Sequence, residues 1–467
     1  MARHGLQEFY DALPIKVQGL LVSLAGYRSY RWRVGRPYQR VVNQLVRSDQ
    51  LSMESLRADQ DSRLREIIDW CAHTVPFYQE MFRREGIDPD SIRSVEDLAL
   101  IPHLDKETVR KRSSELLSTA IPRRAMVTAQ TSGTTGTALS IYHTGDAMAW
   151  KHAVTMRQRS WFGFGPNDRY AVFGGQTVVP FSQRSAPFWR EDRARSRMLF
   201  SLYHMKDQFL EAYYDELVSG RYSFWQGYPS SVGILASFIL DAGLELGAAA
   251  PRAVFTSSET LLDFHAERLE EATGAPIADL YSNAEFSVSA LQCPEGRYHV
   301  DTEFCVLEID PHEETEDWVR GEVISTGFSN RAMPFLRYRT GDVATLLKRT
   351  TCPCGRNRPI LEKIDGRIED YIVTPDGRRI GRMDHIFKGA LQVREAQIVQ
   401  DAPDHLLVRI VPRIGFREGE RRDLERAFRM RVGADLRIDY VEVDEIPRER
   451  SGKFRAVVSE IDAGQLR

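Results

Sequence analysis

A run of small hydroxyl residues and glycines at residues 131–136 could hold a phosphate group. It reads Thr131-Ser132-Gly133-Thr134-Thr135-Gly136 and follows a segment that is expected to form a strand. Glycine lets the backbone approach a ligand closely, and backbone N–H groups and hydroxyls can surround phosphate oxygens. No Gly-Lys-Ser/Thr sequence follows, which disfavours a Walker-type nucleotide hydrolase. Taken alone, the loop could also be an ordinary flexible turn.

A second candidate is a set of cysteines and a histidine that could form a metal site. Cys293 and His299 are close in sequence, and Cys352 and Cys354 follow about fifty residues later. Three thiols and one imidazole suit a tetrahedral structural zinc ion, although the spacing is not a standard finger pattern. Cys305 could replace one ligand. The alternative is a group of buried apolar cysteines beside an unrelated histidine.

Lys453, near the end of the sequence, could supply a cation to a reacting phosphate. It follows Ser451 and Gly452 and is followed by Arg455. A fixed ammonium group stabilises the negative charge that develops when a phosphoryl group is transferred. Without the other motifs, a solvated tail lysine would be the simpler interpretation.

Composition limits the class of protein that could carry these residues. The 467 residues are enough for two or three folding units. Lysine and arginine (63) nearly balance aspartate and glutamate (66), so neither nucleic acid nor an anionic membrane is indicated as a partner of the whole molecule. The apolar run at 17–25 is too short and polar to span a bilayer. Five cysteines without a secretory signal indicate a reducing cytoplasm.

The pattern of apolar residues predicts an α/β fold with three parts. Residues 1–100 are expected to be helical, because apolar residues such as Leu64, Ile67 and Ile68 recur at helical spacing. In residues 101–366, short β-rich runs alternate with helical stretches, which predicts an α/β core. Residues 367–467 mix short strands and one charged helix, which predicts a small α+β domain.

Five segments in a fixed order make the chain resemble the adenylate-forming superfamily of acyl-CoA synthetases, peptide-synthetase adenylation domains and luciferases. Besides the loop at 131–136, they are Tyr281-Ser-Asn-Ala-Glu285, Tyr338-Arg-Thr-Gly-Asp342, Gly366-Arg-Ile-Glu-Asp370 and Ser451-Gly-Lys453. Gln226-Gly-Tyr-Pro-Ser230 and Cys352-Pro-Cys-Gly-Arg356 look most like the phenylacetate-CoA ligase family and its capsular polysaccharide (CapK-like) branch. The resemblance implies a large N-terminal domain of β-sheets flanked by helices and a small mobile α+β C-terminal domain.

The resemblance also implies a nucleotide site. Tyr281 would stack on adenine, Glu285 would hold Mg²⁺, and Asp342 would accept hydrogen bonds from the ribose hydroxyls. Each residue also has a structural interpretation: Tyr281 as a core tyrosine, Glu285 as part of a surface ion pair, and Asp342 as an aspartate in a turn. Further nucleotide contacts are implied for Ser258, Glu259, Ser282 and Arg367, although a helix N-cap explains the first two equally well and a solvated surface residue the last.

Two further roles concern movement of the C-terminal domain. By resemblance, Lys453 would act in adenylation, and Glu369 would be the hinge that carries this lysine away afterwards. The alternative for Glu369 is a surface glutamate. The threonine that the family has before its acidic residue is Ala284 here, so one hydroxyl near the phosphate is absent.

These roles imply an AMP-forming acid–thiol ligase. ATP and a small carboxylic acid would give acyl-AMP and pyrophosphate, and coenzyme A would then displace AMP. A carrier-protein thiol or an amine as acceptor, a catalytically weak scaffold of the same fold, and a homodimer remain open. Trp225, Tyr228 and Phe286 are candidates for the acid pocket, because each is next to a nucleotide motif; core packing is their alternative.

Overall fold

The computed structural model describes residues 8–33, 36–130, 139–348, 351–367, 372–374, 379–380, 393–413, 416–432, 436–448 and 453–461. The predicted phosphate loop, residues 131–136, and the predicted hinge residue Glu369 lie outside these ranges.

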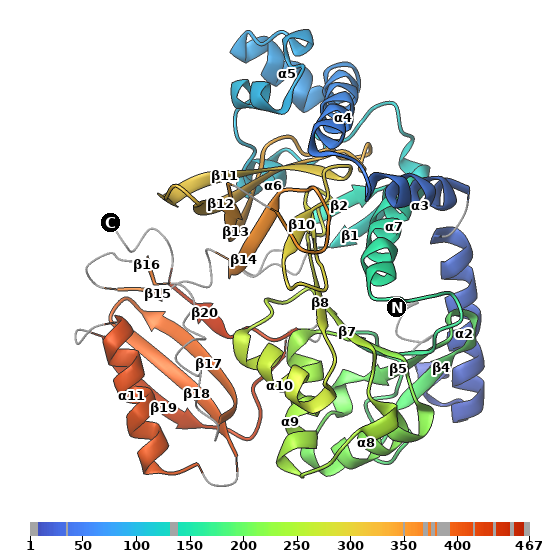
Figure 1. The fold of residues 1–467 in the computed structure, drawn as a ribbon, viewed down its shortest axis with the longest axis vertical. Helices are drawn as coiled ribbons and strands as arrows, with labels where there is room; N and C mark the ends of the chain where they lie inside the picture. Colours follow the sequence, from blue (N-terminus) through green and yellow to red (C-terminus); the bar gives the residue numbers. More distant parts are fainter. Residues whose placement is uncertain are drawn as a thin grey trace.

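A twelve-stranded sheet forms the centre of the large domain (Figure 1). From edge to edge its strands are β11 (Cys305–Glu314), β12 (Trp318–Gly327), β13 (Tyr338–Leu347), β14 (Ile360–Arg367), β10 (Tyr298–Val300), β9 (Ser289–Gln292), β8 (Ile277–Ser282), β7 (Ala253–Ser257), β6 (Phe224–Gly227), β3 (Tyr170–Gly174), β5 (Arg197–Ser201) and β4 (Trp189–Asp192). Strands β8, β7, β6, β3 and β5 are parallel to one another, while β9 and β4 pair antiparallel with β8 and β5 at the two ends of this set. β1 (Val127–Gln130) and β2 (Ser140–His143) form a separate antiparallel pair that flanks the predicted phosphate loop.

Helices cover this sheet and build most of the first hundred residues, as predicted. They are α2 (Ile15–Arg33), α3 (Arg36–Ser48), α4 (Met53–Thr74), α5 (Pro76–Glu85), α6 (Lys106–Lys111), α7 (Gly145–Trp161), α8 (Asp207–Gly220), α9 (Pro229–Asp241) and α10 (Asp263–Thr273), with short 3₁₀ turns η1 (Pro89–Ser91), η2 (Val95–Leu100), η3 (Arg123–Ala125), η4 (Arg193–Arg195), η5 (Leu202–His204) and η6 (Gly247–Ala249). The recurring apolar residues Leu64, Ile67 and Ile68 form the buried face of α4. Pro76 ends that run and begins α5, because proline lacks the N–H that a helix interior needs.

The C-terminal domain has its own four-stranded sheet and core. The sheet order is β19 (Arg437–Glu442), β18 (His405–Pro412), β17 (Val393–Ala402) and β20 (Val457–Ser459), with α11 (Glu418–Val432) on one face and a hairpin of β15 (Ile372–Val373) and β16 (Arg379–Ile380) beside it. Ile398, Leu406 and Phe428 belong to one buried cluster that joins the sheet to the helix. The predicted α/β fold with a separate α+β domain is confirmed. Within the described residues, no helix is both long and apolar enough to cross a membrane.

We propose that the two domains divide at residues 366/367, as the sequence predicts. β14 is an inner strand of the large sheet and ends at Arg367, and the strands of the second sheet begin at Val393. We also propose residues 1–100 as the helical part of the large domain and residues 101–366 as its core.

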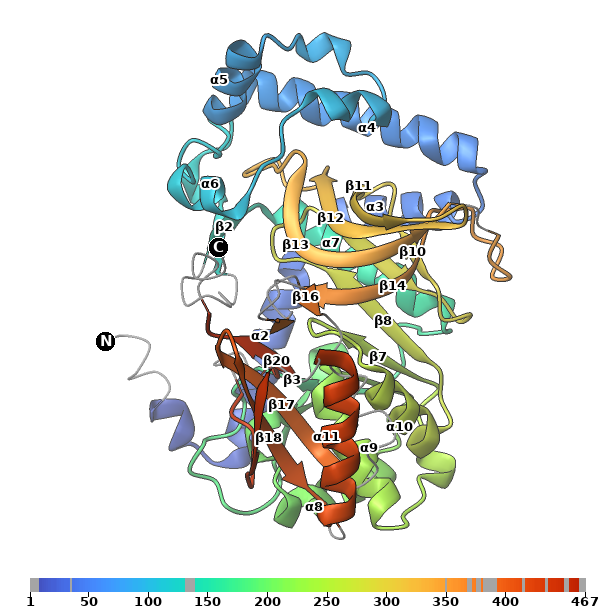
Figure 2. The same ribbon diagram turned by 90° about the vertical axis from the view of Figure 1, so that its left-hand side faces the viewer.

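The described contacts between the domains include several ion pairs. They join Arg394 to Asp207, Lys206 to Glu445 (3.3 Å) and Arg413 to Asp241 (2.9 Å). Both views show the C-terminal sheet beside α8, α9 and α10 (Figures 1 and 2). Exposed ion pairs contribute little net stability, so a contact of this kind can open and close without a large energetic cost.

A buried charge cluster joins four distant segments of the large domain. Glu303 follows β10 and accepts from Arg157 of α7 (3.0 Å) and from Arg358, just before β14 (2.7 Å). Arg358 also donates to Ser48 of α3 (3.3 Å), and Arg157 is paired with Asp301. The two guanidinium groups hold the pKa of Glu303 well below its usual range, although burial alone would raise it. The cluster therefore depends on an ionised Glu303.

Replacing Glu303 with glutamine should lower the free energy of unfolding by about 3 kcal/mol, because each of two buried guanidinium groups would lose one counter-charge, while Asp301 and Asp49 would remain. Since the folded pKa is depressed, the stabilisation is present above the unfolded pKa of about 4.3 and is lost as the pH falls below it. Urea unfolding monitored by circular dichroism would measure both effects. Glu313→Gln, which removes an exposed carboxylate paired with Arg320, is the control. Equal losses in the two variants would contradict this account.

Candidate active site

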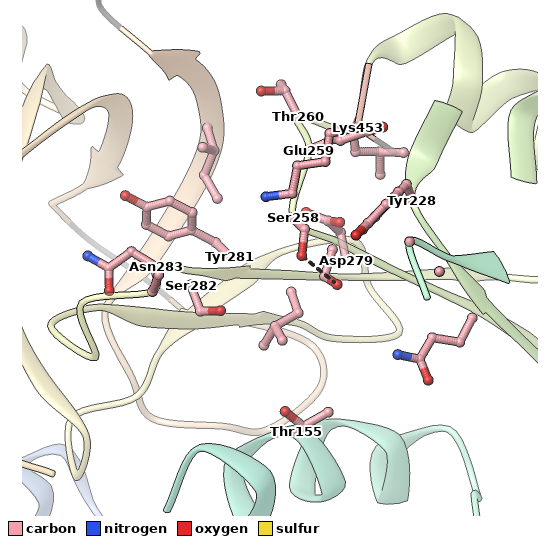
Figure 3. Close-up of a pocket in the computed structure, with 18 of the residues that line it drawn as sticks. Thr155, Tyr228, Ser258, Glu259, Thr260, Asp279, Tyr281, Ser282, Asn283 and Lys453 are labelled. Carbon is pink, nitrogen blue, oxygen red and sulfur yellow. Dashed lines mark hydrogen bonds between the residues drawn. The ribbon is translucent and has the colours of Figure 1, made fainter. Parts of the chain in front are cut away.

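A cavity of about 890 Å³ lies between the large sheet and the C-terminal domain. The described residues that line it include Met148, Lys151, His152, Thr155 and Arg159 from α7, Gln226 and Tyr228 from β6 and its end, Ser258 and Glu259 after β7, Tyr281, Ser282, Asn283, Ala284 and Glu285 from β8 and its end, Asp342 of β13, and Lys453. Figure 3 shows Tyr228, Ser258, Tyr281 and Lys453 around the cavity, with Thr155 of α7 on the side opposite Lys453. Residues predicted from separate motifs thus share one cavity.

The segment after β8 is held in one conformation by its own hydrogen bonds. The side-chain oxygen of Asn283 accepts from the backbone N–H of Ser287 (3.0 Å), and its amide donates to the Ser287 hydroxyl (2.7 Å). This loop places the buried Glu285 at the cavity wall, where the Tyr338 hydroxyl donates to it at 3.5 Å. A carboxylate fixed in this way can serve as a metal ligand.

Tyr281 and Asp342 are in direct contact. The Tyr281 hydroxyl donates to one carboxylate oxygen of Asp342 at 2.8 Å. A turn at Gly341, whose φ of +75° suits glycine, and a bond from the Asp342 N–H to Thr340 (3.0 Å) set the carboxylate in place. The backbone of Arg367 pairs with Asp342 in the sheet, while the side chain of Arg367 lies outside the described part of the chain.

Lys453 belongs to the C-terminal domain, and the next residue, Phe454, holds this segment against the large domain. The backbone N–H of Phe454 donates to Glu259 of the large domain at 2.6 Å, while its ring packs with Val411 and Ile446 of its own domain. The other Glu259 oxygen accepts from the N–H of Ser230 in the first turn of α9 (3.1 Å). Glu259 therefore connects the domains, and Figure 3 shows it beside Lys453.

One expectation for the segment at 258–259 changes with this geometry. The segment does not cap the next helix, since α10 begins at Asp263 after Leu262. Glu259 instead places its negative charge at the N-terminus of α9, where the helix dipole favours it. Each of its oxygens accepts from one backbone N–H, and each keeps a further lone pair that could accept from a ligand. Ser258 lines the cavity and is exposed to it.

Sequence reasoning missed Lys151. Its ammonium group donates to the backbone oxygen of Asn283 at 2.9 Å and lies 5.0 Å from the centre of the Phe286 ring. Burial lowers its pKa to about 8; Glu285 counteracts this change and Lys453 adds to it. The available signal was helical spacing, because Met148, Lys151 and Thr155 are three and four residues apart and share one face of α7.

The three residues predicted to form the acid pocket do not all lie at the cavity. Tyr228 lines the cavity, but neither Trp225 nor Phe286 does. Successive residues of a strand point to opposite faces, so Gln226 faces the cavity while Trp225 is fully buried on the other side against Phe173. Phe286 has a positive φ of 61°, and its ring packs against His143 at a centroid distance of 5.0 Å.

The predicted metal ligands meet at one point of the structure, and none of the four is among the residues that line the cavity. The ligand atoms of Cys293, His299, Cys352 and Cys354 all lie within 4.8 Å of one another. The sulfur atoms of Cys293 and Cys352 are 3.8 Å apart, and Cys354 sulfur lies 3.2 Å from Nε2 of His299. Zinc–sulfur bonds of about 2.3 Å in a tetrahedron give a sulfur separation of about 3.8 Å, so the donor set fits a zinc ion.

Comparisons with known proteins agree with this architecture. A family model described as the CapK C-terminal domain matches residues 372–460. The protein CapK of Staphylococcus aureus is 24% identical over 465 residues, covering 98% of this chain and all of that one. A phenylacetate-coenzyme A ligase of Thermus thermophilus is 25% identical over 349 residues, covering 69% of this chain and 73% of the ligase.

Solved structures of 2-hydroxyisobutyryl-CoA ligase share the fold. In its postadenylation state with an acyl-AMP, that enzyme is 20% identical, covers 90% of this chain with 92% of its own, and superposes with a TM-score of 0.70. Its open and thioesterification states give TM-scores of 0.56 and 0.58. The comparisons agree with the resemblance that the motifs indicate: this chain is similar over nearly its whole length to CapK, over 69% of its length to a phenylacetate-coenzyme A ligase, and in fold to 2-hydroxyisobutyryl-CoA ligase.

Proposed function

We propose that the protein activates a small carboxylic acid with ATP as acyl-AMP and then transfers the acyl group to coenzyme A. One observation carries the proposal: Lys453 of the C-terminal domain lines the same cavity as Tyr281, Glu285 and Asp342 of the large domain. Phosphoryl transfer depends mainly on positioned charge, and this cavity brings the ammonium group of Lys453 together with the carboxylates of Glu285 and Asp342. The coenzyme A ligases named above support the choice of acceptor.

We infer a role for each nucleotide-binding residue from its contacts. Tyr281 offers its ring to adenine while its hydroxyl holds Asp342. The second oxygen of Asp342 can accept from a ribose hydroxyl. Glu285 would hold Mg²⁺, which prefers carboxylate oxygens and phosphate ligands.

We infer that two lysines stabilise the charge that moves during adenylation. A carboxylate oxygen of the acid attacks the α-phosphorus, the new P–O bond forms, and the bond to pyrophosphate breaks with its electron pair. Negative charge grows on the leaving pyrophosphate and stays on the equatorial oxygens. Lys453 approaches from the C-terminal domain and Lys151 from α7. Since Lys151 donates to the residue before Ala284, it supplies a donor next to the missing hydroxyl.

We further propose that the C-terminal domain rotates between the two half-reactions, about a hinge at Glu369. The fit is better to the postadenylation state of 2-hydroxyisobutyryl-CoA ligase than to its thioesterification state, with TM-scores of 0.70 and 0.58. The described arrangement thus suits the first half-reaction. Rotation would break the Phe454–Glu259 bond and withdraw Lys453 from the cavity, which opens a path for a thiol.

The decisive experiment measures AMP and pyrophosphate from the full chain and ATP with a panel of aryl, fatty and amino acids. Each acid is tested with and without coenzyme A, and the products are identified by mass. We expect at least one acid to give equal amounts of AMP and acyl-CoA. If acid-dependent AMP forms only when a carrier-protein thiol or an amine is present, that compound would replace coenzyme A as the proposed acceptor. Phosphate release without any acid, or no ATP consumption with any acid, would refute the proposal.

We propose that Cys293, His299, Cys352 and Cys354 hold a structural zinc ion. Three of these residues are buried, and they tie the β9–β10 turn to the segment before β14. The ion would fix this segment and supply no chemistry to the cavity.

The full chain purified without chelator should contain one zinc ion, measured by elemental mass spectrometry against protein concentration. Cys354→Ser should bind less than a tenth as much zinc and unfold at a lower temperature, because a tetrahedral site loses a thiolate. Cys71→Ser changes a buried cysteine of α4 outside the cluster and should keep the full zinc content. A parent chain without zinc, or equal contents in both variants, would show that the cluster is not a zinc site.

A further inference from the structure

Helix α2 presents a stripe of exposed apolar side chains, which we call the α2 stripe. Its members are Val17, Leu20, Leu21, Leu24 and Tyr27. They are three and four residues apart, so they share one face of the helix. Leu20 is 68% exposed and Leu24 is 54% exposed, where a helix of a globular protein normally presents polar groups. A contiguous apolar surface of this kind indicates an interaction site.

The opposite face of α2 is firmly packed, so the exposure is not that of a detached helix. Gln18 is buried and accepts from Arg190 of β4 at 2.8 Å. The Ser23 hydroxyl donates to the backbone oxygen of Glu191 at 3.1 Å. A side chain in place of Gly26 would collide with the carboxylate of Asp192. Figure 1 shows α2 along the edge of the large domain that lies away from the C-terminal domain.

Basic residues are frequent in the sequence around this stripe. Residues 12–48 contain seven lysines and arginines and no aspartate or glutamate, although the whole chain has a net charge of −3. Lys16 and Arg28 are exposed on α2, and Arg40 and Arg47 are exposed on the adjoining α3. Apolar and cationic side chains are therefore concentrated in one stretch of a chain that is otherwise acidic.

We propose that the α2 stripe docks onto an anionic lipid surface. Leucine and valine would enter the boundary between headgroups and acyl chains, and tyrosine suits the level of the headgroups. Lysine and arginine beside them would attract anionic lipids. The helix lies on the membrane in this arrangement and does not cross it.

A second copy of the chain is the less suitable occupant. Two-fold symmetric association places the same patch of each copy against the other. The basic residues of α2 and α3 would then approach their own counterparts, and like charges oppose such contact. An anionic bilayer satisfies both the apolar and the cationic character of this surface.

Co-sedimentation of the full chain with vesicles tests the proposal. Vesicles of equal parts phosphatidylcholine and phosphatidylglycerol should bind the parent chain at least tenfold more tightly than vesicles of phosphatidylcholine alone. Raising the salt concentration should weaken that binding. The double variant Leu20→Glu/Leu24→Glu should lose at least tenfold in affinity for the anionic vesicles, since two exposed leucines no longer leave water. Leu100→Glu is the matched control on η2, because Leu100 is 55% exposed there.

Circular dichroism and ATP–pyrophosphate exchange should be unchanged in both variants, because these side chains lie on the surface away from the cavity. Equal vesicle binding by the parent and the double variant would overturn the proposal. A parent chain that does not bind anionic vesicles would also overturn it. The same holds if the parent chain is a dimer that does not bind these vesicles and the double variant is a monomer. That last result would assign the α2 stripe to contact between two copies.

Discussion

Replacing Lys453 with alanine should reduce acid-dependent ATP–pyrophosphate exchange by about a thousandfold. The lysine is the cation that the C-terminal domain brings to a cavity already lined by Glu285 and Asp342. Loss of one charge-stabilising donor in a site shielded from water costs about 100- to 1,000-fold in rate. We expect the Lys453 variant to lie at the upper end of this range of rate losses, because an ammonium group can stabilise both the equatorial oxygens and the leaving pyrophosphate.

The second half-reaction separates this role from a structural one. If Lys453 acts only in adenylation, Lys453→Ala should still convert a chemically prepared acyl-AMP to acyl-CoA at nearly the parent rate. Lys111→Ala, which removes an exposed lysine of α6 paired with Glu107, should leave both rates unchanged. Equal losses in the two half-reactions of Lys453→Ala would contradict the assignment.

Replacing Lys151 with methionine should reduce the same exchange by about a hundredfold. Methionine keeps much of the side-chain length but removes the positive charge and the hydrogen bond to Asn283. The loss should be smaller than for Lys453, because the Lys151 ammonium group already donates one hydrogen bond to the backbone oxygen of Asn283. The variant should fold as well as the parent, since a desolvated cation does not favour the folded state.

Exchange rates and thermal unfolding of the same samples would test this. Lys111→Met is the matched control, with the same chemical change at an exposed position. A lowered unfolding temperature that accounts for the lost activity would make Lys151 a structural residue. Full activity of Lys151→Met would remove it from the mechanism.

The sequence predicted which motif residues line the cavity, but it did not predict the contacts between distant segments that hold them there. Tyr281, Glu285, Asp342 and Lys453 were assigned from short motifs that carry their own turn chemistry, and all four line one cavity. Lys151 belongs to no motif. Its position depends on how α7 packs against the loop after β8, and contacts between such distant segments are not encoded in local spacing.

The same limit explains the aromatic residues and the sheet. Trp225 is adjacent to a motif, but the alternation of a strand turns it to the buried face. The short β-rich runs that the sequence predicts in residues 101–366 are present as strands, among them β3, β7 and β12. Their joining into one sheet of twelve strands depends on pairings between distant segments, for example β10 with β14.

The ion pairs that join the two domains have a consequence for the speed of the enzyme. Arg394–Asp207, Lys206–Glu445 and Arg413–Asp241 each include a solvated partner, so dissolved electrolyte competes with them directly. If the C-terminal domain rotates as proposed, added salt should favour the separated domains, slow the adenylation step and help the later approach of the thiol. The ionic strength would then decide which of the two proposed half-reactions limits turnover.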